Sequence, residues 1–273
     1  MRRVATCSAL VVLGMLWAAG AQAQATGQAP ATSQDKAQAK ATASMPSVDD
    51  IIEKHLAASG GRAALAKLGS RTATGTIAMS MQGNQIPGTV DIFLKAPNKT
   101  RTYIKMDLAQ FGMGEVVVDQ RCDGKIGWAS NSMQGEREIT GDQLQGMLNA
   151  SFPTPLLNYK ELGAKIELVG KEKLGDRDAY VLRYSPKAGP VSTSYFDAET
   201  FHDLRTVTKI NVPEAGGEIE QTTDSEDFRD LDGVKIPYVI KIVNPMQAMT
   251  ITFTKIEHNK PIDEAMFSKP AAK

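Results

Sequence analysis

Three histidines and two cysteines are the side chains of this 273-residue chain best suited to catalysis or metal binding. His55, His202 and His258 lie far apart, and none belongs to a nucleophile or metal pattern such as Gly-x-Ser-x-Gly or His-Glu-x-x-His. We therefore expect each histidine at the surface. We expect no catalytic residue, no metal and no cofactor, and thus no enzyme.

Two Asp-Gly pairs, Asp123-Gly124 and Asp232-Gly233, lack the carboxylate spacing of a calcium loop and are typical of hairpin turns. Cys122 directly precedes the first pair, where a small buried residue is a better explanation than a reactive thiol. The acidic stretch from Glu218 to Asp230 is expected to be a solvated strand face rather than a docking site for a basic partner.

Apolar side chains are the more informative candidates for function, and methionine is common among them. Thioether side chains adapt to exchangeable partners, so the methionines fit either a lipid pocket or an ordinary sheet core. Trp128 fits either the mouth of a cavity or a buried stabilising indole. The methionine set is Met79, Met81, Met106, Met113, Met133, Met147, Met246 and Met249. The candidate cavity residues are Met79, Met81, Ile92, Leu94, Met106, Trp128, Leu144, Met147 and Leu148.

The first residues have the three parts of a secretory signal peptide. Arg2 and Arg3 precede an apolar run from Val4 to Ala19, and small residues follow up to Ala23, where we expect cleavage. The run is interrupted by polar residues and is shorter than the ~20 residues of a membrane span. Cys7 lies too early to be a lipoprotein cysteine. We therefore expect a periplasmic protein with residues 1–23 removed and no lipid anchor.

The charge of the chain narrows the possible partners, and its cysteine content limits how the fold can be stabilised. The chain has 31 basic and 31 acidic residues, so loss of Arg2 and Arg3 leaves 29 against 31, a net charge of −2. No basic block is present, which argues against nucleic acid as a partner. Only Cys122 remains after cleavage, so the fold must rest on its core rather than on an intramolecular disulfide.

Residues 24–46 are rich in Ala, Gln, Ser and Thr and are expected to form a disordered linker. Residues 47–270 are expected to form a single domain. It opens with Ser47-Val-Asp-Asp50, a capping box ahead of a helix that ends at Gly60-Gly61. A second short helix is expected from Arg62 to Leu68.

Beyond Ser70 the apolar residues recur at every second position, which predicts strands with one apolar and one wet face. Such strands are typical of antiparallel sheets. We expect about eleven of them with short connections. The runs centre on Ala73–Met81, Val90–Leu94, Ile104–Met106, Val116–Val118, Ile126–Trp128, Ile166–Leu168, Tyr180–Tyr184, Leu204–Val212, Val234–Ile242 and Met249–Phe253.

One helix interrupts the strands. Thr140-Gly-Asp-Gln143 reads as a capping box, and Leu144, Met147 and Leu148 follow at helical spacing over 140–152. A wide sheet must cover its apolar face by curling or by packing helices against it, and the expected helices are short. A partly filled apolar concavity would be a site for hydrocarbon.

Four sequence segments resemble the strand and turn motifs of the periplasmic lipoprotein-carrier superfamily, the LolA/LolB-like proteins. The stretch from Ile51 to Thr76 is similar to outer-membrane lipoprotein-sorting proteins of that group. The four segments are Cys122-Asp-Gly-Lys-Ile-Gly-Trp128, Tyr195-Phe-Asp-Ala-Glu-Thr200, Phe228-Arg-Asp-Leu-Asp-Gly-Val-Lys-Ile-Pro237 and Ile262-Asp-Glu-Ala-Met-Phe-Ser-Lys-Pro270.

The resemblance implies a mainly β fold: an open half-barrel of about eleven antiparallel strands, with short helices covering the concave face and acyl chains held in the cavity. It assigns no individual binding residue. We expect a carrier or binding protein for lipids or lipoprotein acyl chains, with a membrane-bound donor or acceptor protein as a further partner. The alternative is an envelope sensor or scaffold of the same fold that binds a protein partner.

Overall fold

The computed structural model describes residues 45–81, 83–212 and 217–269. The expected signal peptide and residues 24–44 of the expected linker lie outside the described residues. Among the helices that the structure describes, none is long and apolar enough to cross a membrane.

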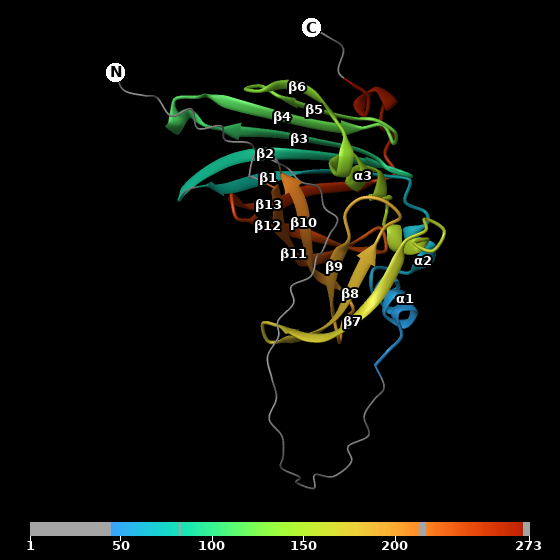
Figure 1. Ribbon diagram of the computed structural model, residues 1–273. Coiled ribbons are helices and arrows are strands. Elements are labelled where there is room, and N and C mark those ends of the chain that lie inside the picture. The colour runs from blue at the N-terminus through green and yellow to red at the C-terminus, as the bar shows by residue number, and fades with distance from the viewer. Residues whose placement is uncertain (1–44, 82, 213–216, 270–273) are drawn as a thin grey trace, which may run out of the picture.

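The described residues form one antiparallel sheet of thirteen strands, which remains open (Figure 1). Its spatial order is β6-β5-β4-β3-β2-β1-β13-β12-β11-β10-β9-β8-β7. Two meanders, β1 to β6 and β7 to β13, therefore meet at the pair β1–β13. The strands are β1 (Ser70–Met81), β2 (Asn84–Lys95), β3 (Lys99–Asp107), β4 (Glu115–Cys122), β5 (Gly127–Asn131), β6 (Gly135–Ile139), β7 (Lys165–Leu174), β8 (Arg177–Ser185), β9 (Ser192–Asp197), β10 (Asp203–Val212), β11 (Gly217–Leu231), β12 (Val234–Asn244) and β13 (Gln247–His258).

The mainly β antiparallel class is confirmed, but the number of strands is thirteen rather than about eleven. The strands without a predicted apolar run are β6, β9 and β11, of which β11 contains the acidic stretch that was predicted as a solvated strand face. In β6 four of the five residues are exposed, as fits an edge strand. In β9 the buried positions include Ser192 and Ser194, so burial there does not follow hydrophobicity.

Backbone conformation explains one of the two-residue hairpins. Between β11 and β12, Asp232 and Gly233 both have positive φ, 53° and 78°, as a two-residue hairpin turn with right-handed strand twist requires. A bulge in β13 places Thr254 between the partners of Thr74 and Gly75, and here the β13 backbone lies so close that a Cβ at Gly75 would be 2.3 Å from the carbonyl oxygen of Thr252.

Three short α-helices accompany the sheet: α1 (Val48–Ala58), α2 (Arg62–Leu65) and α3 (Gly141–Asn149). The capping box of α1 is confirmed, since Ser47 Oγ accepts from the Asp50 amide at 3.1 Å and the Asp50 carboxylate accepts from the Ser47 amide at 3.2 Å. Helix α2 ends three residues earlier than predicted. Thr140 precedes α3 as its N-cap but makes no side-chain capping bond, so the predicted capping box there is wrong.

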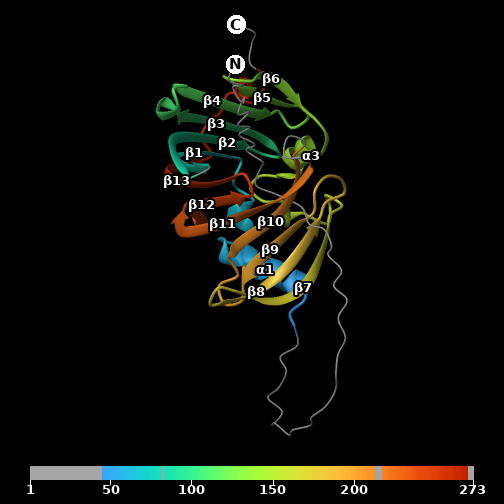
Figure 2. The same ribbon diagram turned by 60° about the vertical axis from the view of Figure 1, so that its left-hand side comes forward.

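One face of the sheet carries most of the core. Residues paired directly across antiparallel strands share a face, and the pairs Ile77–Ile251, Ile240–Ile251 and Val90–Ile104 place this core on a single face of both meanders. Figures 1 and 2 show the two meanders curling relative to one another, with α1 beside β7 and β8. We call this the concave face.

Two buried clusters lie on the concave face. The interior cluster consists of Ile77, Met79, Ile86, Val90, Ile104, Met106, Leu108, Val116, Val118, Ile240, Ile242, Met249 and Ile251. The lid cluster joins α1 and α2 to the other end of the same face, and its members include Ile51, Ile52, Leu56, Leu65, Ala73, Ile236 and Ile256. Because Ala73 and Ile77 are four residues apart on β1, both clusters lie on the same face.

Candidate binding site

The predicted cavity residues Met79 and Met106 lie together in the interior cluster. Their side chains are 0% and 1% exposed. A ligand can therefore reach them only after neighbouring side chains move apart.

Ile92 and Leu94 lie nearer the helices. Both are partly buried, and Ile92 packs against the interior cluster as well as the lid cluster, whereas Leu94 packs against the lid cluster. Phe253, which the sequence did not single out, bridges the same two clusters. Ile92 and Phe253 thus mark the junction through which apolar contact is continuous along the concave face.

The three predicted residues of α3 form a separate small cluster. Met147 is buried with Cys122 and Ile139, and Leu144 and Leu148 pack against them while partly exposed. Helix α3 also reaches the loop after β8, because Asn149 Nδ2 donates to the carbonyl oxygen of Ala188 at 2.8 Å. The helix therefore links the β5–β6 edge of the sheet to the opposite meander (Figure 1).

The remaining two predicted residues lie elsewhere. Trp128 pairs with Arg121 across β4 and β5, one position out of phase with Cys122 and Gly127. Its side chain is thus on the face opposite to the concave face. Met81 ends β1, and its side chain lies outside the described part of the chain.

Polar bonds hold α1 over the sheet. Tyr159 Oη donates to Asp49 Oδ1 at 2.6 Å, and Lys160 Nζ lies 2.8 Å from Asp49 Oδ2. At the other end of α1, the Lys235 amide donates to the Ser59 carbonyl oxygen at 3.1 Å. Few such bonds are buried, so their loss on moving the helix would be compensated by water.

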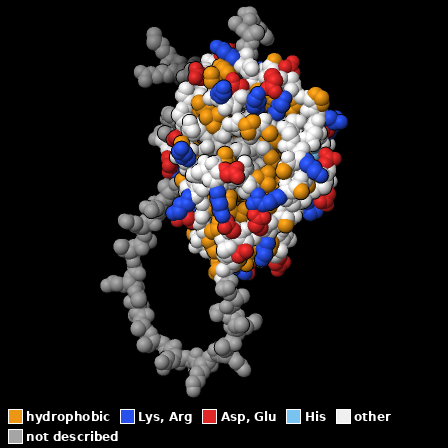
Figure 3. All heavy atoms as spheres, turned by 90° about the vertical axis from the view of Figure 1, so that its right-hand side faces the viewer, with side chains coloured by type: hydrophobic (Ala, Val, Ile, Leu, Met, Phe, Trp, Pro, Cys, Tyr) orange, Lys and Arg blue, Asp and Glu red, His pale blue; other side chains and the backbone are white. Residues whose placement is uncertain are grey.

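Figure 3, which views the molecule from the helix side, shows hydrophobic side chains in the middle of this face with charges of both signs around them.

A pocket of about 170 Å³ opens beside α1 and α2, and we call it the lid pocket. Its apolar walls include Leu65, Leu156 and Ile236, which are members of the lid cluster. Its polar and charged lining comprises His55, Ser59, Arg71, Thr154, His202, Asp203, Ser225 and Lys235. The pocket therefore combines apolar walls with convergent polar groups, as sites for a small molecule or part of one do.

Arg71 is the unusual cation of the lid pocket. Its Nε donates to His258 Nε2 at 3.1 Å, while the guanidinium carbon lies 5.4 Å from the centre of the Phe152 ring. Burial lowers the pKa of Arg71 to about 10, so the group stays charged at neutral pH. Among the described residues, no carboxylate lies within 4 Å of its nitrogens.

Asp203 is the unusual acid of the same pocket. Its Oδ2 accepts from Thr206 Oγ1 at 3.3 Å, whereas its buried Oδ1 has no hydrogen-bond partner within the described part of the chain. Burial raises the pKa of Asp203 to about 7. A carboxyl in this state exchanges its proton near neutral pH, and its protonated form can donate a hydrogen bond.

The prediction of surface positions for the histidines is wrong, since His55 and His202 are partly buried and His258 is buried. Burial lowers the pKa of His55 to about 4, so its ring is neutral and Nδ1–H donates to the Phe201 carbonyl oxygen at 2.8 Å. His258 is 7% exposed and its Nδ1 lies 3.0 Å from Asp232 Oδ2. It thereby links the exposed Asp232 to Arg71. Cys122 is buried, as predicted.

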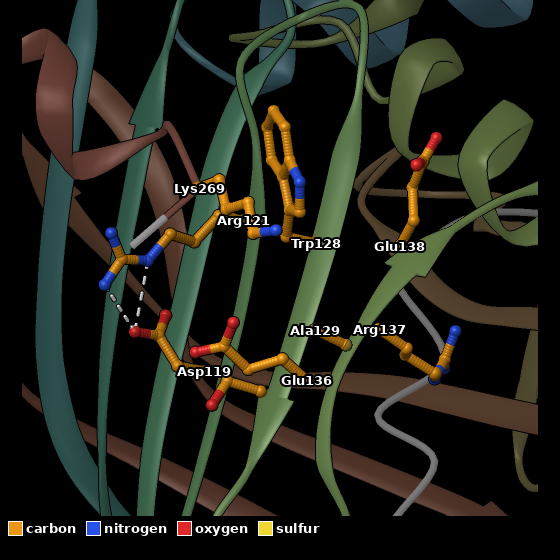
Figure 4. A pocket seen from close by; sticks show the side chains of 9 residues that line it. Asp119, Arg121, Trp128, Ala129, Glu136, Arg137, Glu138 and Lys269 are labelled. Carbon is orange, nitrogen blue, oxygen red and sulfur yellow. Dashed lines mark hydrogen bonds and ion pairs between the residues drawn. The ribbon is translucent and has the colours of Figure 1, made fainter. Parts of the chain in front are cut away.

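A second pocket, of about 150 Å³, lies on the face opposite to the concave face (Figure 4). Arg121 and Arg101 both bond to Asp119, at 2.7 and 2.8 Å, so its buried charges are paired internally. Figure 4 shows Glu136 on the same side as Asp119, whereas Arg137 points away. Mixed and mutually neutralised charge makes this pocket a weaker candidate than the lid pocket. Among the described residues, no three His, Cys, Asp or Glu side chains are arranged to hold a metal ion.

Arg71 and Asp203 were not among the predicted site residues, and His55 was expected at the surface. Arg71 could have been identified from the sequence. It is in phase with Ala73, Gly75 and Ile77, so a charged residue occupies a position where the alternation predicts an apolar one. Asp203 had no such signal, since an acid at the first position of a strand, next to a turn, is ordinary.

No protein-family model and no curated protein matches the chain. Several solved structures match the chain. The chain is similar to a LolA superfamily protein from Nitrosomonas europaea, with 12% identity and a TM-score of 0.54 over 82% of this chain and 99% of that chain. A DUF1329 family protein from Desulfovibrio piger has 11% identity and a TM-score of 0.53 over 81% and 97%. A putative outer membrane lipoprotein-sorting protein domain from Vibrio parahaemolyticus has 11% identity and a TM-score of 0.50 over 80% and 94%. The chain therefore has the LolA-like fold, which confirms the fold that the resemblance implied.

Proposed function

We propose that this LolA-like chain is a non-enzymatic carrier or binding protein for the acyl chains of lipids or lipoproteins, working in the periplasm. The observation that carries the proposal is the continuous apolar concave face, on which the interior cluster and the lid cluster meet at Ile92 and Phe253 beneath short helices. The names of the LolA superfamily protein and the lipoprotein-sorting domain support the choice of ligand. A membrane-bound protein would act as donor or acceptor.

The energy of binding would come from hydrocarbon leaving water, at about 0.8 kcal/mol per methylene group. Because the interior cluster is closed, entry requires movement of a helix or rearrangement of the core. Met79, Met106 and Met249 are unbranched and can rearrange without loss of apolar contact. We expect α1 with α2, or α3, to part from the sheet and admit the chain.

The first test is chemical. The mature protein is purified without detergent from its native envelope, extracted with organic solvent and analysed by mass spectrometry, and its uptake of a fluorescent acyl probe is titrated. A stoichiometric acyl species, or saturable probe binding, is expected. An empty protein that also fails to bind the probe contradicts the proposal.

A matched pair of variants locates the site. Ile92→Glu places a charge at the junction of the two clusters and should weaken probe binding at least tenfold, because the acyl chain would have to desolvate it. Thr89→Glu places the same charge at an exposed position of the same strand and should bind as the unmodified protein does. Circular dichroism checks that both variants are folded. Equal binding by both folded variants would remove Ile92 from the site.

The second candidate function is a sensor or scaffold that binds a protein partner. It is favoured by the closed interior and by the two open edges of the sheet, β6 and β7. On β6, four of the five residues are exposed. An added strand could pair with this edge. Crosslinking in intact cells distinguishes the two functions, since a scaffold yields a defined protein adduct and no bound lipid.

A further inference from the structure

We propose that the lid pocket binds the oxyanion of the acyl ligand through Arg71, as the carboxylate of a fatty acid or the phosphate of a phospholipid. The inference rests on the proposed function and adds the polar end of the ligand to its apolar part. It assigns the hydrocarbon to the concave face and the headgroup to the lid pocket.

The first reason is the unpaired charge of Arg71. A buried cation without an anion is costly, and its Nε is already bonded to His258, which in turn is held by Asp232. These two bonds fix the orientation of the guanidinium and leave its two terminal amino groups available. Two parallel N–H donors match the two oxygens of a carboxylate or phosphate.

The second reason is Asp203, which lines the same pocket and has a buried oxygen without a partner in the described residues. In its protonated form the carboxyl can donate to the oxyanion, whereas in its ionised form it repels the oxyanion. Binding should therefore weaken as the pH rises through about 7, the pKa to which burial raises this group.

The other charged or titratable groups of the pocket do not compensate Arg71. Lys235, from β12, pairs with Asp230 at 2.9 Å. His55, from α1, is neutral at physiological pH because burial lowers its pKa. His202, which directly precedes β10, also has its pKa lowered by burial. The unpaired charge in the pocket is thus positive whenever Asp203 is protonated.

The third reason is size and position. The pocket, of about 170 Å³, is small and half polar in its lining, which suits a headgroup better than an acyl chain. Leu65, Leu156 and Ile236 belong to both the pocket wall and the lid cluster, so a chain attached to the headgroup would continue directly into apolar contacts.

The experiment compares ligands that differ only in the headgroup. Dodecanoate, dodecyl phosphate, dodecanol and inorganic phosphate are titrated into the mature protein at pH 6.0 and 8.0 by calorimetry. We expect the two anionic amphiphiles to bind at least tenfold more tightly than dodecanol at pH 6.0. Arg71→Gln should remove this preference and leave dodecanol binding intact, which also shows that the variant is folded. Arg71→Lys should retain part of the preference.

Two further variants sharpen the result. Asp203→Asn should bind dodecanoate equally well at both pH values. Arg229→Gln, which removes an exposed arginine whose side chain lies over Tyr238 outside the pocket, should leave the preference unchanged.

The outcomes separate the two proposals. Equal binding of dodecanoate and dodecanol by the unmodified protein refutes the oxyanion site while acyl binding stands. Failure of both to bind refutes the proposed function. Binding of inorganic phosphate alone, lost in Arg71→Gln, would identify a free anion as the ligand and refute the acyl assignment.

Discussion

Replacing Asp203 by Asn should make the protein more stable, and increasingly so as the pH rises. The substitution keeps the shape of the side chain and an oxygen that can accept from Thr206, but it removes the buried charge. In the native protein, Oδ1 of Asp203 is buried without a partner, and burial raises the pKa of the carboxyl from 3.8 to about 7.

The magnitude follows from the two pKa values. Between pH 3.8 and about 7 the unfolded chain has released the proton that the folded protein still holds, so the free energy of unfolding falls as the pH rises. At about 1.4 kcal/mol per pKa unit, the full cost is about 4 kcal/mol above pH 7. About 2 kcal/mol of it develops between pH 5 and pH 7. Asp203→Asn should recover this amount.

The assay is urea denaturation at pH 5, 6, 7 and 8, followed by circular dichroism. His55 acts in the opposite direction below pH 6.5, because burial lowers its pKa to about 4, but its contribution cancels in the difference between the variant and the unmodified protein. Asp178→Asn is the control. Lys171 and Lys173 lower the pKa of Asp178 to about 2, so its charge is constant over this range and the difference should be independent of pH.

A difference between Asp203→Asn and the unmodified protein that stays constant from pH 5 to pH 8 would refute the reasoning. It would mean that Asp203 is ionised in the folded protein throughout this range. The headgroup site would then lack the proton donor that we assign to it, while the role of Arg71 would be unaffected.

Two further predictions concern the core and its charged flank. Met79→Ala should lower the free energy of unfolding by about 2–5 kcal/mol through loss of buried contacts, whereas Met133→Ala, at a side chain that is 56% exposed, should change it by less than about 0.5 kcal/mol; chemical denaturation measures both. Asp119→Asn should lower it by about 3 kcal/mol, because Arg101 and Arg121 are each 13% exposed and would lose their shared partner. Equal stability of Asp119→Asn and the unmodified protein in the same assay would show that water replaces the carboxylate.

Alternation of apolar residues predicted most of the sheet because its strands bury one face only. Ile77 and Met79 alternate with exposed Thr76 and Ala78, and the face so defined is the one that the structure buries. The prediction failed for β9 because Ser192 and Ser194 are buried by neighbouring strands rather than by their own hydrophobicity. Hydroxyls of this kind give no periodic signal.

The candidate site was predictable only in its apolar part. Met79, Met106 and Ile92 were identified by their type and phase, and the structure places them on the concave face. The polar part depends on tertiary proximity between β1 and β10, which no local pattern encodes. Arg71 was the exception, since its phase within β1 conflicts with its charge.

The seam between β1 and β13 has a consequence for how the chain acquires its structure. Every other strand pair joins neighbours in the sequence, but the bond between Arg71 and His258 spans 187 residues. Folding rates fall as contacts become more distant in sequence, so we expect each meander to form early and the seam to close last. Until then β1 presents a twelve-residue unpaired edge, the kind of edge on which chains aggregate. A chain that emerges with its N-terminus first would expose this edge until nearly the whole chain had emerged. A chaperone would be needed most during this interval.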